Sequence, residues 1–514
     1  MRRNRWTKLS SAALALAGLL AIAGCDVEVP DLNNPGTDQL EDTPTATKVA
    51  AACTGLLIGS RAGTSAANGF IMQMAILGRE GFNFDPADPR FVSEMLEGSL
   101  SPASPFGGAF WGQGYTNMRL GDIIQRAKDN VPDFGDGADT KTTAISGFVK
   151  TIRALDLLRL LETRDNIGAV IDTDHDFDTL APIVGKVELQ NEIVRLLDEG
   201  ADELAGGGDA FPFQLSSGFE GFDAPSTTFL QFNRALRVRI AIYQAELDPS
   251  QYDTVLELLP ETFLNDAPAT VADLEVGTYH AFGTGIGDVQ NGLVNPNIWT
   301  HPSVVADAED NDTRVFDPAQ GPRVGAGRKV AQAAGTQSDR GVTATDRPLL
   351  YTRPDSRVPI IRNEELLLFR AEAEIETGDL AAAKADIDLN RSISGALPAL
   401  ADGLDELGML KALIKERRYA LLFEGRRLVD ARRLNARMIE LSPAEELADD
   451  GTWISAEIPL DTGSDPEGNP VPHQLNVRWP VNQSECNAGA DATACGKGSI
   501  VGDWWADEQA LLGN

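Results

Sequence analysis

The sequence predicts a mostly α-helical fold with minor β structure. Apolar residues recur at the helical spacing i, i+3, i+4 and i+7 in three long segments, 143–164, 191–205 and 228–248. A further segment, 363–390, has a cap at Asn363, acids in its first turn, a glycine at Gly378 and a second cap at Asp379. This pattern predicts two helices joined by a short turn, packed closely through alanines in the manner of a tetratricopeptide unit.

The first residues predict an exported, lipid-anchored chain. Arg2, Arg3, Arg5 and Lys8 precede an apolar run over 9–22, which is typical of a secretory signal peptide at 1–24. The segment Ile22-Ala23-Gly24-Cys25 resembles the bacterial lipobox, so Cys25 is the predicted site of lipidation. Acyl chains on Cys25 would anchor the chain in the membrane without a transmembrane helix.

Composition divides the remaining chain into four regions that together form one compact unit. Residues 25–45 are acidic and rich in Pro and Asn, which predicts a lipidated tether. Residues 46–250 are predicted as an N-terminal helical region, and 359–514 as a C-terminal helical region. Between them, 251–358 are dominated by Gly, Pro, Asp and short β-like pieces. We expect a loop-rich insertion there that forms the ligand-side surface, because such loops often carry function.

Charge and motif content exclude several classes of function. The chain has 44 Lys and Arg against 77 Asp and Glu, for a formal net charge of −33. Loss of 1–24 would make it more negative, since that segment has four basic residues and no acids. Such a surface repels nucleic acid. The sequence also lacks H-E-x-x-H, G-x-S-x-G and Walker A motifs, so we expect no enzyme of those types.

Cysteine and acidic patterns leave two questions open. Cys486 and Cys495 flank a Gly/Ala/Asp loop, and they form either a local disulfide or two thiols. The run DTDHDFD at 172–178 predicts either a solvated acidic loop or a structural calcium site, and it lacks the glycine and glutamate of an EF-hand loop. Four scattered histidines argue against zinc. We therefore expect no cofactor and no metal.

Aromatic residues in Gly- and Pro-rich settings are the candidate ligand-binding residues, since sugar rings stack on aromatic faces. The chain has only seven Trp and six Tyr. The candidates are Phe82, Phe84, Trp111, Tyr115, Tyr279 and Trp299.

Residues 415–434 form a basic stretch in an acidic chain, with seven basic and three acidic side chains. On a helix, Glu424 and Arg427, Arg427 and Asp430, and Arg426 and Asp430 are three or four residues apart and can pair locally. Arginine also suits carboxylates and carbonyls at helix junctions. We interpret the stretch as a structural ion-pair helix rather than a phosphate site. Its predicted members are Glu416, Arg417, Glu424, Arg426, Arg427 and Asp430.

Seven blocks, taken in order, resemble the SusD/RagB-like family of outer-membrane nutrient-uptake lipoproteins. They are LNNP (32–35), FWGQGYTNMRLGDIIQRA (110–127), ISGFVKTIRALDLLRLLE (145–162), NDTRVFD (311–317), VPIIRNEELLLFRAEAEIETGD (358–379), KERRYALLFEGRRLVDARRL (415–434) and RWPVNQSECN (478–487). The resemblance covers most of the mature chain. It implies an irregular helical body with about four tetratricopeptide-like helix pairs.

The same resemblance implies a function and a partner. The chain would face the cell exterior on the outer membrane and bind an oligomeric nutrient, a glycan by default or else a peptide. It would deliver this nutrient to a SusC-like TonB-dependent β-barrel transporter. Two alternatives remain at this stage: a surface-anchored, tetratricopeptide-like scaffold that binds proteins, and a surface glycan hydrolase.

Overall fold

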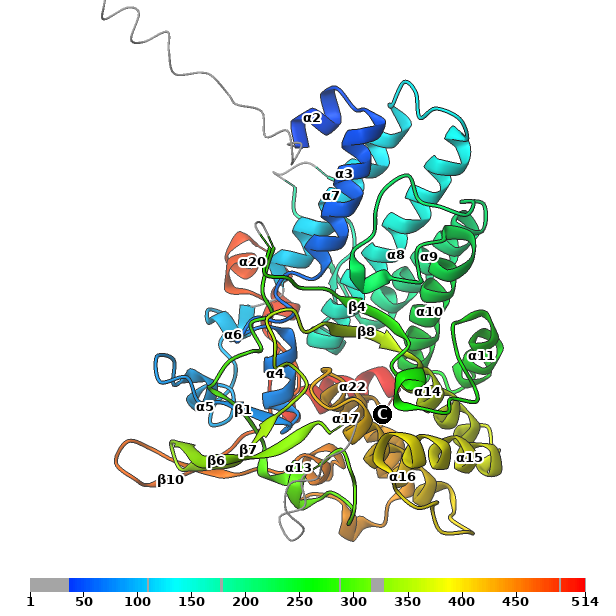
Figure 1. Ribbon diagram of the computed structural model, residues 1–514. Helices are drawn as coiled ribbons and strands as arrows, with labels where there is room; N and C mark the ends of the chain where they lie inside the picture. The colour runs from blue at the N-terminus through cyan, green and yellow to red at the C-terminus, as the bar shows by residue number, and fades with distance from the viewer. Residues whose placement is uncertain are drawn as a thin grey trace, which may run out of the picture.

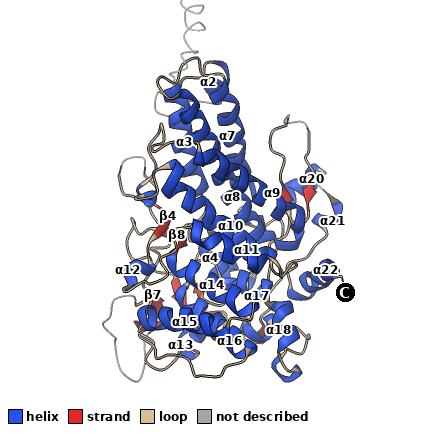
Figure 2. Cartoon of the chain, turned by 90° about the vertical axis from the view of Figure 1, so that its right-hand side faces the viewer, coloured by secondary structure: helices blue, strands red, loops and turns tan. Residues whose placement is uncertain are grey.

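The computed structural model describes residues 37–108, 111–175, 179–285, 288–315, 328–489 and 491–513. The predicted signal peptide at 1–24, the lipidation site Cys25 and most of the predicted tether lie outside these ranges. Within them, the chain is mostly helical with small sheets, as predicted (Figures 1 and 2). No helix of the described ranges combines the length and apolar content needed to cross a bilayer.

The N-terminal part is a stack of helices. Its members are α2 (Thr37–Asp42), α3 (Ala46–Ser60), α4 (Phe70–Leu77), α5 (Arg90–Ser93), α6 (Pro105–Gly108), α7 (Trp111–Asp129), α8 (Ala138–Arg164), α9 (Lys186–Ala205), α10 (Leu230–Gln244) and α11 (Gln251–Leu258). Helices α3 and α7, α8 and α9, and α10 and α11 pack in pairs. The α8–α9 pair is close because glycines meet there: a Cβ on Gly147 would lie 2.7 Å from the carbonyl oxygen of Gly200.

The C-terminal part continues the helical body. Its helices are α12 (Val271–Leu274), α13 (Pro302–Ala306), α14 (Asn363–Glu376), α15 (Leu380–Asn390), α16 (Glu406–Ala420), α17 (Arg427–Arg433), α18 (Asn435–Leu441), α19 (Ile454–Glu457), α20 (Gln483–Ala488), α21 (Ala492–Cys495) and α22 (Val501–Leu512). The α14–α15 hairpin forms where predicted: Gly378 has φ +89° and Asp379 accepts a hydrogen bond from the Ala382 amide. Asn363, the expected cap, instead accepts from the Asn265 amide at 2.8 Å.

Within the described ranges, the strands form four small antiparallel sheets. The largest has the order β1-β5-β7-β6, and three pairs join β2 with β3, β4 with β8 and β9 with β10. The bounds are β1 (Gly81–Asn83), β2 (Ala169–Val170), β3 (Ile183–Val184), β4 (Gly277–His280), β5 (Ile298–Thr300), β6 (Val330–Asp339), β7 (Val342–Pro348), β8 (Val358–Arg362), β9 (Thr462–Ser464) and β10 (Pro470–Pro472). Four of these strands, β4 to β7, lie within the predicted insertion 251–358, and β8 begins at its last residue. In Figure 1, β4 and β8 cross the middle of the molecule, and β1, β6 and β7 lie at lower left.

One hydrophobic cluster runs through both helical regions and the insertion between them. Cys53 is buried in that cluster, as its apolar surroundings in the sequence suggest. Cys486 and Cys495 form a disulfide that joins α20 to α21. The disulfide therefore closes a short local loop near the C-terminal end.

The basic stretch at 415–434 is not one helix. Helix α16 ends at Ala420 and α17 begins at Arg427, and the turn between them contains Phe423 with φ +57° and Gly425 with φ +76°. A Cβ on Gly425 would lie 2.8 Å from the Phe70 ring, so both the backbone conformation and the close neighbour require glycine there. The turn changes the direction of the chain, so the arginines of α17 do not continue the face of α16.

The arginines of this stretch join segments that are distant in sequence. Arg417 pairs with Asp430 at 2.9 Å, Arg433 with Glu372 at 2.7 Å, and Arg426 with Glu162, all of them buried. The three local pairs expected on a continuous helix are wrong, because their acids bind other arginines. Glu424 pairs with Arg362, and Asp430 pairs with Arg417 and Arg433. The interpretation as a structural ion-pair element agrees with these contacts.

Arg427 and Arg432 bind mainly backbone. Arg427 donates to the Gly78 carbonyl at 2.8 Å, and Arg432 donates to the carbonyls of Val477 and Glu162 at 2.5 and 2.6 Å. Glu416 pairs with Arg314. Guanidinium groups therefore hold α4, α8 and the segment before α20 against the α16–α17 turn.

We expect Arg426→Ala to destabilise the fold by about 3–5 kcal/mol, because it leaves Glu162 buried without its charged partner. The free energy of unfolding from urea titration measures this loss. Arg353→Ala is the control, since Arg353 pairs only with its neighbour Asp355 and is largely exposed, and we expect little change there. Equal stability of the two variants would contradict a structural role for the buried arginine.

Candidate ligand-binding pocket

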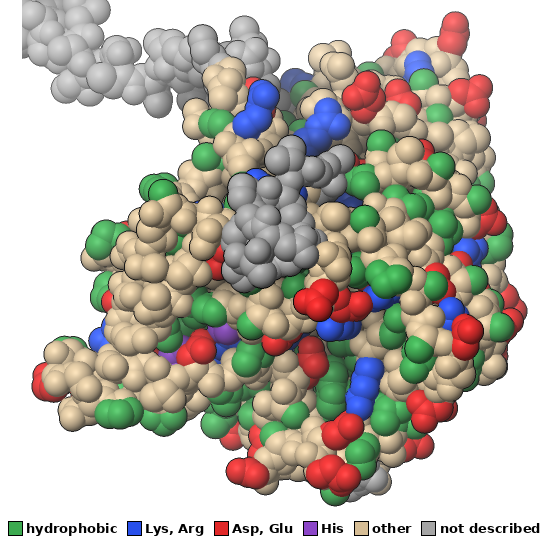
Figure 3. Space-filling view, turned by 60° about the horizontal axis from the view of Figure 1, so that its bottom comes forward, with side chains coloured by type: hydrophobic (Ala, Val, Ile, Leu, Met, Phe, Trp, Pro, Cys, Tyr) green, Lys and Arg blue, Asp and Glu red, His purple; other side chains and the backbone are tan. Residues whose placement is uncertain are grey.

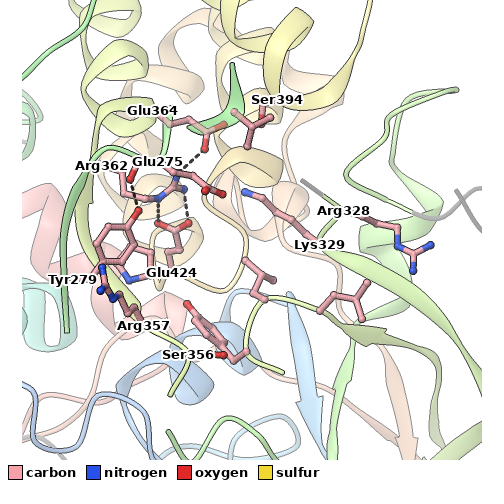
Figure 4. A pocket seen from close by; sticks show the side chains of 15 residues that line it. Glu275, Tyr279, Arg328, Lys329, Ser356, Arg357, Arg362, Glu364, Ser394 and Glu424 are labelled. Carbon is pink, nitrogen blue, oxygen red and sulfur yellow. Dashed lines mark hydrogen bonds and ion pairs between the residues drawn. The ribbon is translucent and has the colours of Figure 1, made fainter. Parts of the chain in front are cut away.

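A pocket of about 640 Å³ lies where the β4–β8 pair meets the start of β6, helix α12 and the α16–α17 turn (Figure 4). Its walls combine ionised groups, hydroxyls, tyrosine rings and aliphatic side chains. The lining residues are Val271, Glu275, Tyr279, Arg328, Lys329, Leu349, Leu350, Tyr351, Ser356, Arg357, Pro359, Arg362, Glu364, Ser394 and Glu424.

Arg362 organises the charged side of the pocket. It is buried at the end of β8, contacts Glu364 at 2.8 Å and binds Glu424 through two nitrogens (Figure 4). Burial alone would lower the pKa of Arg362, but Glu424 and Glu364 raise it well above its usual value. Arg362 therefore stays charged and holds both carboxylates in place.

The C-terminal carbonyl of α16 forms part of the same network. A helix leaves its last carbonyls without internal partners, and Ala420 accepts hydrogen bonds from Arg362, at 3.1 Å, and from Lys329. Burial lowers the pKa of Lys329, an effect that Glu364 opposes. The pKa of Glu364 is raised by burial, but Lys329 and Arg362 bring it below its usual value. These opposite charges neutralise one another at the base of the pocket.

Two tyrosines have different roles in the pocket. The Tyr351 hydroxyl donates to the Phe423 carbonyl at 3.0 Å, which fixes the strained turn between α16 and α17. Tyr279 lies at the rim, where its hydroxyl donates to the Glu275 carbonyl and its side chain lies beside Arg357 (Figure 4). The partly exposed ring of Tyr279 is therefore the aromatic surface available to a ligand.

A buried carboxyl lies beneath this network. Glu80 is 1% exposed, at the start of the turn into β1. Burial raises its pKa to about 8, although Arg427, the Phe423 amide and Arg418 act in the opposite direction. Glu80 therefore carries a proton at neutral pH.

The structure places the six predicted aromatic residues at different sites. Phe82, Phe84 and Trp299 are 1%, 3% and 5% exposed, so the prediction that they are ligand platforms is wrong. Pairing of β1 with β5 sets Phe82 opposite Trp299 in the core, and Arg347 covers the Trp299 ring at 3.7 Å.

The other three predicted aromatic residues, Tyr115, Trp111 and Tyr279, also lie at different places. Tyr115 packs against the core, and its hydroxyl accepts a hydrogen bond from the Val170 amide at 2.8 Å. The side chain of Trp111, at the start of α7, lies outside the described part of the structure. Of the five aromatic side chains that the structure describes, Tyr279 alone lines the pocket.

The charged members of the pocket were not among the predicted ligand-binding residues. Glu424 was predicted as structural, and its contact with Arg362 agrees with that. Arg362 and Glu364 lie in the block 358–379, but a sequence block cannot show that they face a cavity. Lys329 and Tyr351 sit in the insertion without any local motif.

No metal centre is found in the described ranges, where no three His, Cys, Asp or Glu side chains gather as ligands. Of the acidic run considered for calcium, Asp174 pairs with Arg126 and Asp172 accepts from the Asp174 amide at 3.2 Å. Asp176 and Asp178 lie outside the described residues. The described half of the run is therefore engaged by the protein itself.

Comparison with known proteins identifies a family that part of this chain resembles. A model described as the SusD family matches residues 335–491, a span that includes Tyr351, Arg362 and Glu424. Over this span the chain is similar to the SusD family, as its sequence blocks predict. No curated protein matches the sequence.

Solved SusD-type structures share the fold of this SusD/RagB-like chain. A SusD homolog from Bacteroides thetaiotaomicron has a TM-score of 0.60 and 14% identity, and covers 90% of this chain and 98% of its own. NanU from B. fragilis has a TM-score of 0.59, 12% identity, and coverage of 90% and 98%. A SusD-like carbohydrate binding protein from Bacteroides fragilis has a TM-score of 0.58, 15% identity, and coverage of 88% and 99%.

We expect the buried Glu80 carboxyl to weaken the fold as pH rises. Its pKa is about 8 in the folded chain against an ordinary 4.5, so between these values the folded state holds a proton that the unfolded state releases. Stability must therefore fall with rising pH across this window. Glu80→Gln cannot titrate and lacks this loss.

Urea midpoints of both proteins at about pH 5 and about pH 8 measure the effect. The advantage of Glu80→Gln over the parent should grow as pH rises. Glu257→Gln, on the exposed face of α11, supplies a matched control for removal of one carboxylate. An advantage of Glu80→Gln that stays constant with pH would contradict the assignment.

Proposed function

We propose that this SusD/RagB-like chain is a surface-exposed outer-membrane lipoprotein that binds an oligomeric nutrient, a glycan by default, and delivers it to a SusC-like TonB-dependent transporter. The match to the SusD family over 335–491 carries the proposal, because that span includes much of the described pocket. The fold shared with a SusD-like carbohydrate binding protein gives further support.

The chemistry of the pocket suits a polyhydroxylated ligand. Hydroxyls need both donors and acceptors, and the pocket has Ser356, Glu275 and Arg357 at its polar surface. The Tyr279 ring and the aliphatic Leu349 and Leu350 offer faces for the apolar side of a sugar ring. Binding of this kind needs no cofactor.

Two of the three carboxyl groups that line the pocket, Glu364 and Glu424, favour binding over hydrolysis. A glycosidase needs one carboxyl that is protonated near neutral pH as general acid. Glu364 and Glu424 are both held by Arg362, and the pKa of Glu364 lies below its usual value. A carboxylate in this environment is a poor proton donor, so we propose that the chain is not an enzyme.

Location and partner follow from the same proposal. Acyl chains on Cys25 would anchor the chain to the outer membrane with its body facing outward. One face of that body carries acidic side chains along its right and lower margins in Figure 3, in a chain with a formal net charge of −33. Transport needs only that the ligand bind more tightly to one state of the complex than to the other. The transporter would supply the energy.

Gently solubilised membranes test the partner. We expect the full-length chain with an affinity tag to co-purify with a large β-barrel protein, and Cys25→Ser, which cannot be lipidated, to lose the membrane fraction. Mass spectrometry of the eluate identifies the partner. Capture of soluble proteins without a barrel would favour the scaffold alternative instead.

Tyr279→Ala tests the pocket. We expect affinity for a bound glycan to fall about fivefold, because loss of one ring contact costs on the order of 1 kcal/mol. Tyr279→Phe keeps the ring and should bind nearly as the parent does. Calorimetric titration measures both. Equal binding by Tyr279→Ala and the parent would place the ligand elsewhere, and release of reducing sugar would show hydrolysis.

A further inference from the structure

A second hollow of about 780 Å³ lies in the loop between α9 and α10. The loop itself forms the hollow, since all lining residues fall within 210–223. It contains the 3₁₀ turn η2 (Ser217–Phe219) and leads into the π-helix η3 (Pro225–Phe229). Compact surface loops of this kind often carry function.

The hollow pairs aromatic rings with acids. Phe211 and Phe213 are partly exposed there and are held from behind by Phe148, whose ring centroid lies 5.7 and 4.8 Å from theirs. Glu220 and Asp223 are exposed at the same hollow. Fixed rings beside carboxylate acceptors suit a sugar, because the rings contact its C–H face and the acids accept from its hydroxyls.

The two hollows adjoin one another. Arg357 lines the first pocket and Glu220 lines the second, and their charged atoms are 3.9 Å apart. Gly218 lies between two residues that line the second hollow, Ser217 and Phe219, and packs on Tyr279 of the first, where a Cβ would lie 1.9 Å from the Tyr279 carbonyl oxygen. Tyr279 and Arg357 lie side by side on the same rim of the first pocket (Figure 4). A chain-like ligand can therefore pass from one hollow to the other across this rim.

The charges of the two hollows select against an anionic ligand. No Lys, Arg or His is among the residues that line the second hollow, while Glu220 and Asp223 are. In the first pocket, Arg362 is held by Glu364 and Glu424, and Lys329 by the α16 terminus. A carboxylated sugar would meet exposed acids at one end. At the other end Arg362 and Lys329 are engaged by the protein, and Arg357 at the rim already faces Glu220.

We infer that the two hollows form one extended site for an uncharged oligosaccharide, with Tyr279, Arg357 and Glu220 at the crossing point between its two halves. This inference rests on the proposed function and names the ligand class of its site. The second half adds affinity only for chains long enough to reach it, because its contact then becomes intramolecular.

An array of oligosaccharides tests the ligand class. The array holds neutral and uronate glycans from single sugars to about eight units, and the intact protein is tested for binding to each of them. We expect binding to neutral chains that strengthens with length. Binding confined to uronates, or binding that does not change with length, would overturn the inference and leave the proposed function standing. Binding to no glycan would overturn both.

Variants then locate the second half on the best neutral chain. Asp223→Asn changes an exposed side chain and should lower affinity for the long chain about tenfold, with no effect on the shortest chain that binds. Phe213→Ala should do the same if it folds, which its melting temperature shows. Asp253→Asn, an exposed acid that lines neither hollow, is the matched control.

The crossing point has its own variant. Glu220→Gln removes the charge that faces Arg357 and should also weaken only the long chain. Tyr279→Ala should weaken both chains, because Tyr279 belongs to the first pocket. If Asp223→Asn and Glu220→Gln both bind the long chain as the parent and Asp253→Asn do, the second hollow is not part of the site and the inference fails.

Discussion

Burial of charge around the α16–α17 turn is the constraint on which the rest of this structure depends. A buried guanidinium without a partner is far more costly than a paired one. Arg417, Arg426 and Arg433 have carboxylates from α17, α8 and α14 within reach, and these contacts are formed only in the complete fold. The helical body is therefore held by pairs that no single helix supplies. The pocket is built on the same turn through Glu424.

The strained backbone of this turn is also held in place by tertiary contacts. Phe423 and Arg79 are non-glycine residues with φ of +57° and +53°, a conformation that persists only where its surroundings hold it. Their two turns meet: a Cβ on Gly81 would lie 2.5 Å from the Phe423 ring, and the Phe423 amide is close enough to Glu80 to oppose the rise in its pKa. Tyr351 then fixes the turn from the pocket side. Rigidity at the base of the pocket comes from these contacts rather than from a ligand.

Helical periodicity was enough to predict the helical body and the α14–α15 hairpin, because local spacing determines which face of a helix is apolar. It could not predict the break at Gly425, because the close approach of Phe70 to Gly425 is a tertiary contact between residues distant in sequence. The prediction that Phe82 and Trp299 are exposed was wrong for a similar reason. Glycine and proline nearby suggest a loop, but pairing of β1 with β5, more than 200 residues apart in sequence, buries both rings. The pocket itself joins residues from 271 to 424, which no local pattern connects.

Some charged groups of the pocket are used by the fold, and this determines which groups remain free to contact a ligand. Arg362 and Lys329 line the pocket, yet their donors are directed to Glu364, Glu424 and the Ala420 carbonyl. If either cation also had to bind a ligand anion, it would have to weaken the contacts that close α16. Hydroxyls, ring faces and rim groups can engage a ligand without that conflict. A site whose cations are committed to the fold is therefore better matched to neutral polar ligands than to anions, whatever the charge count of its lining suggests.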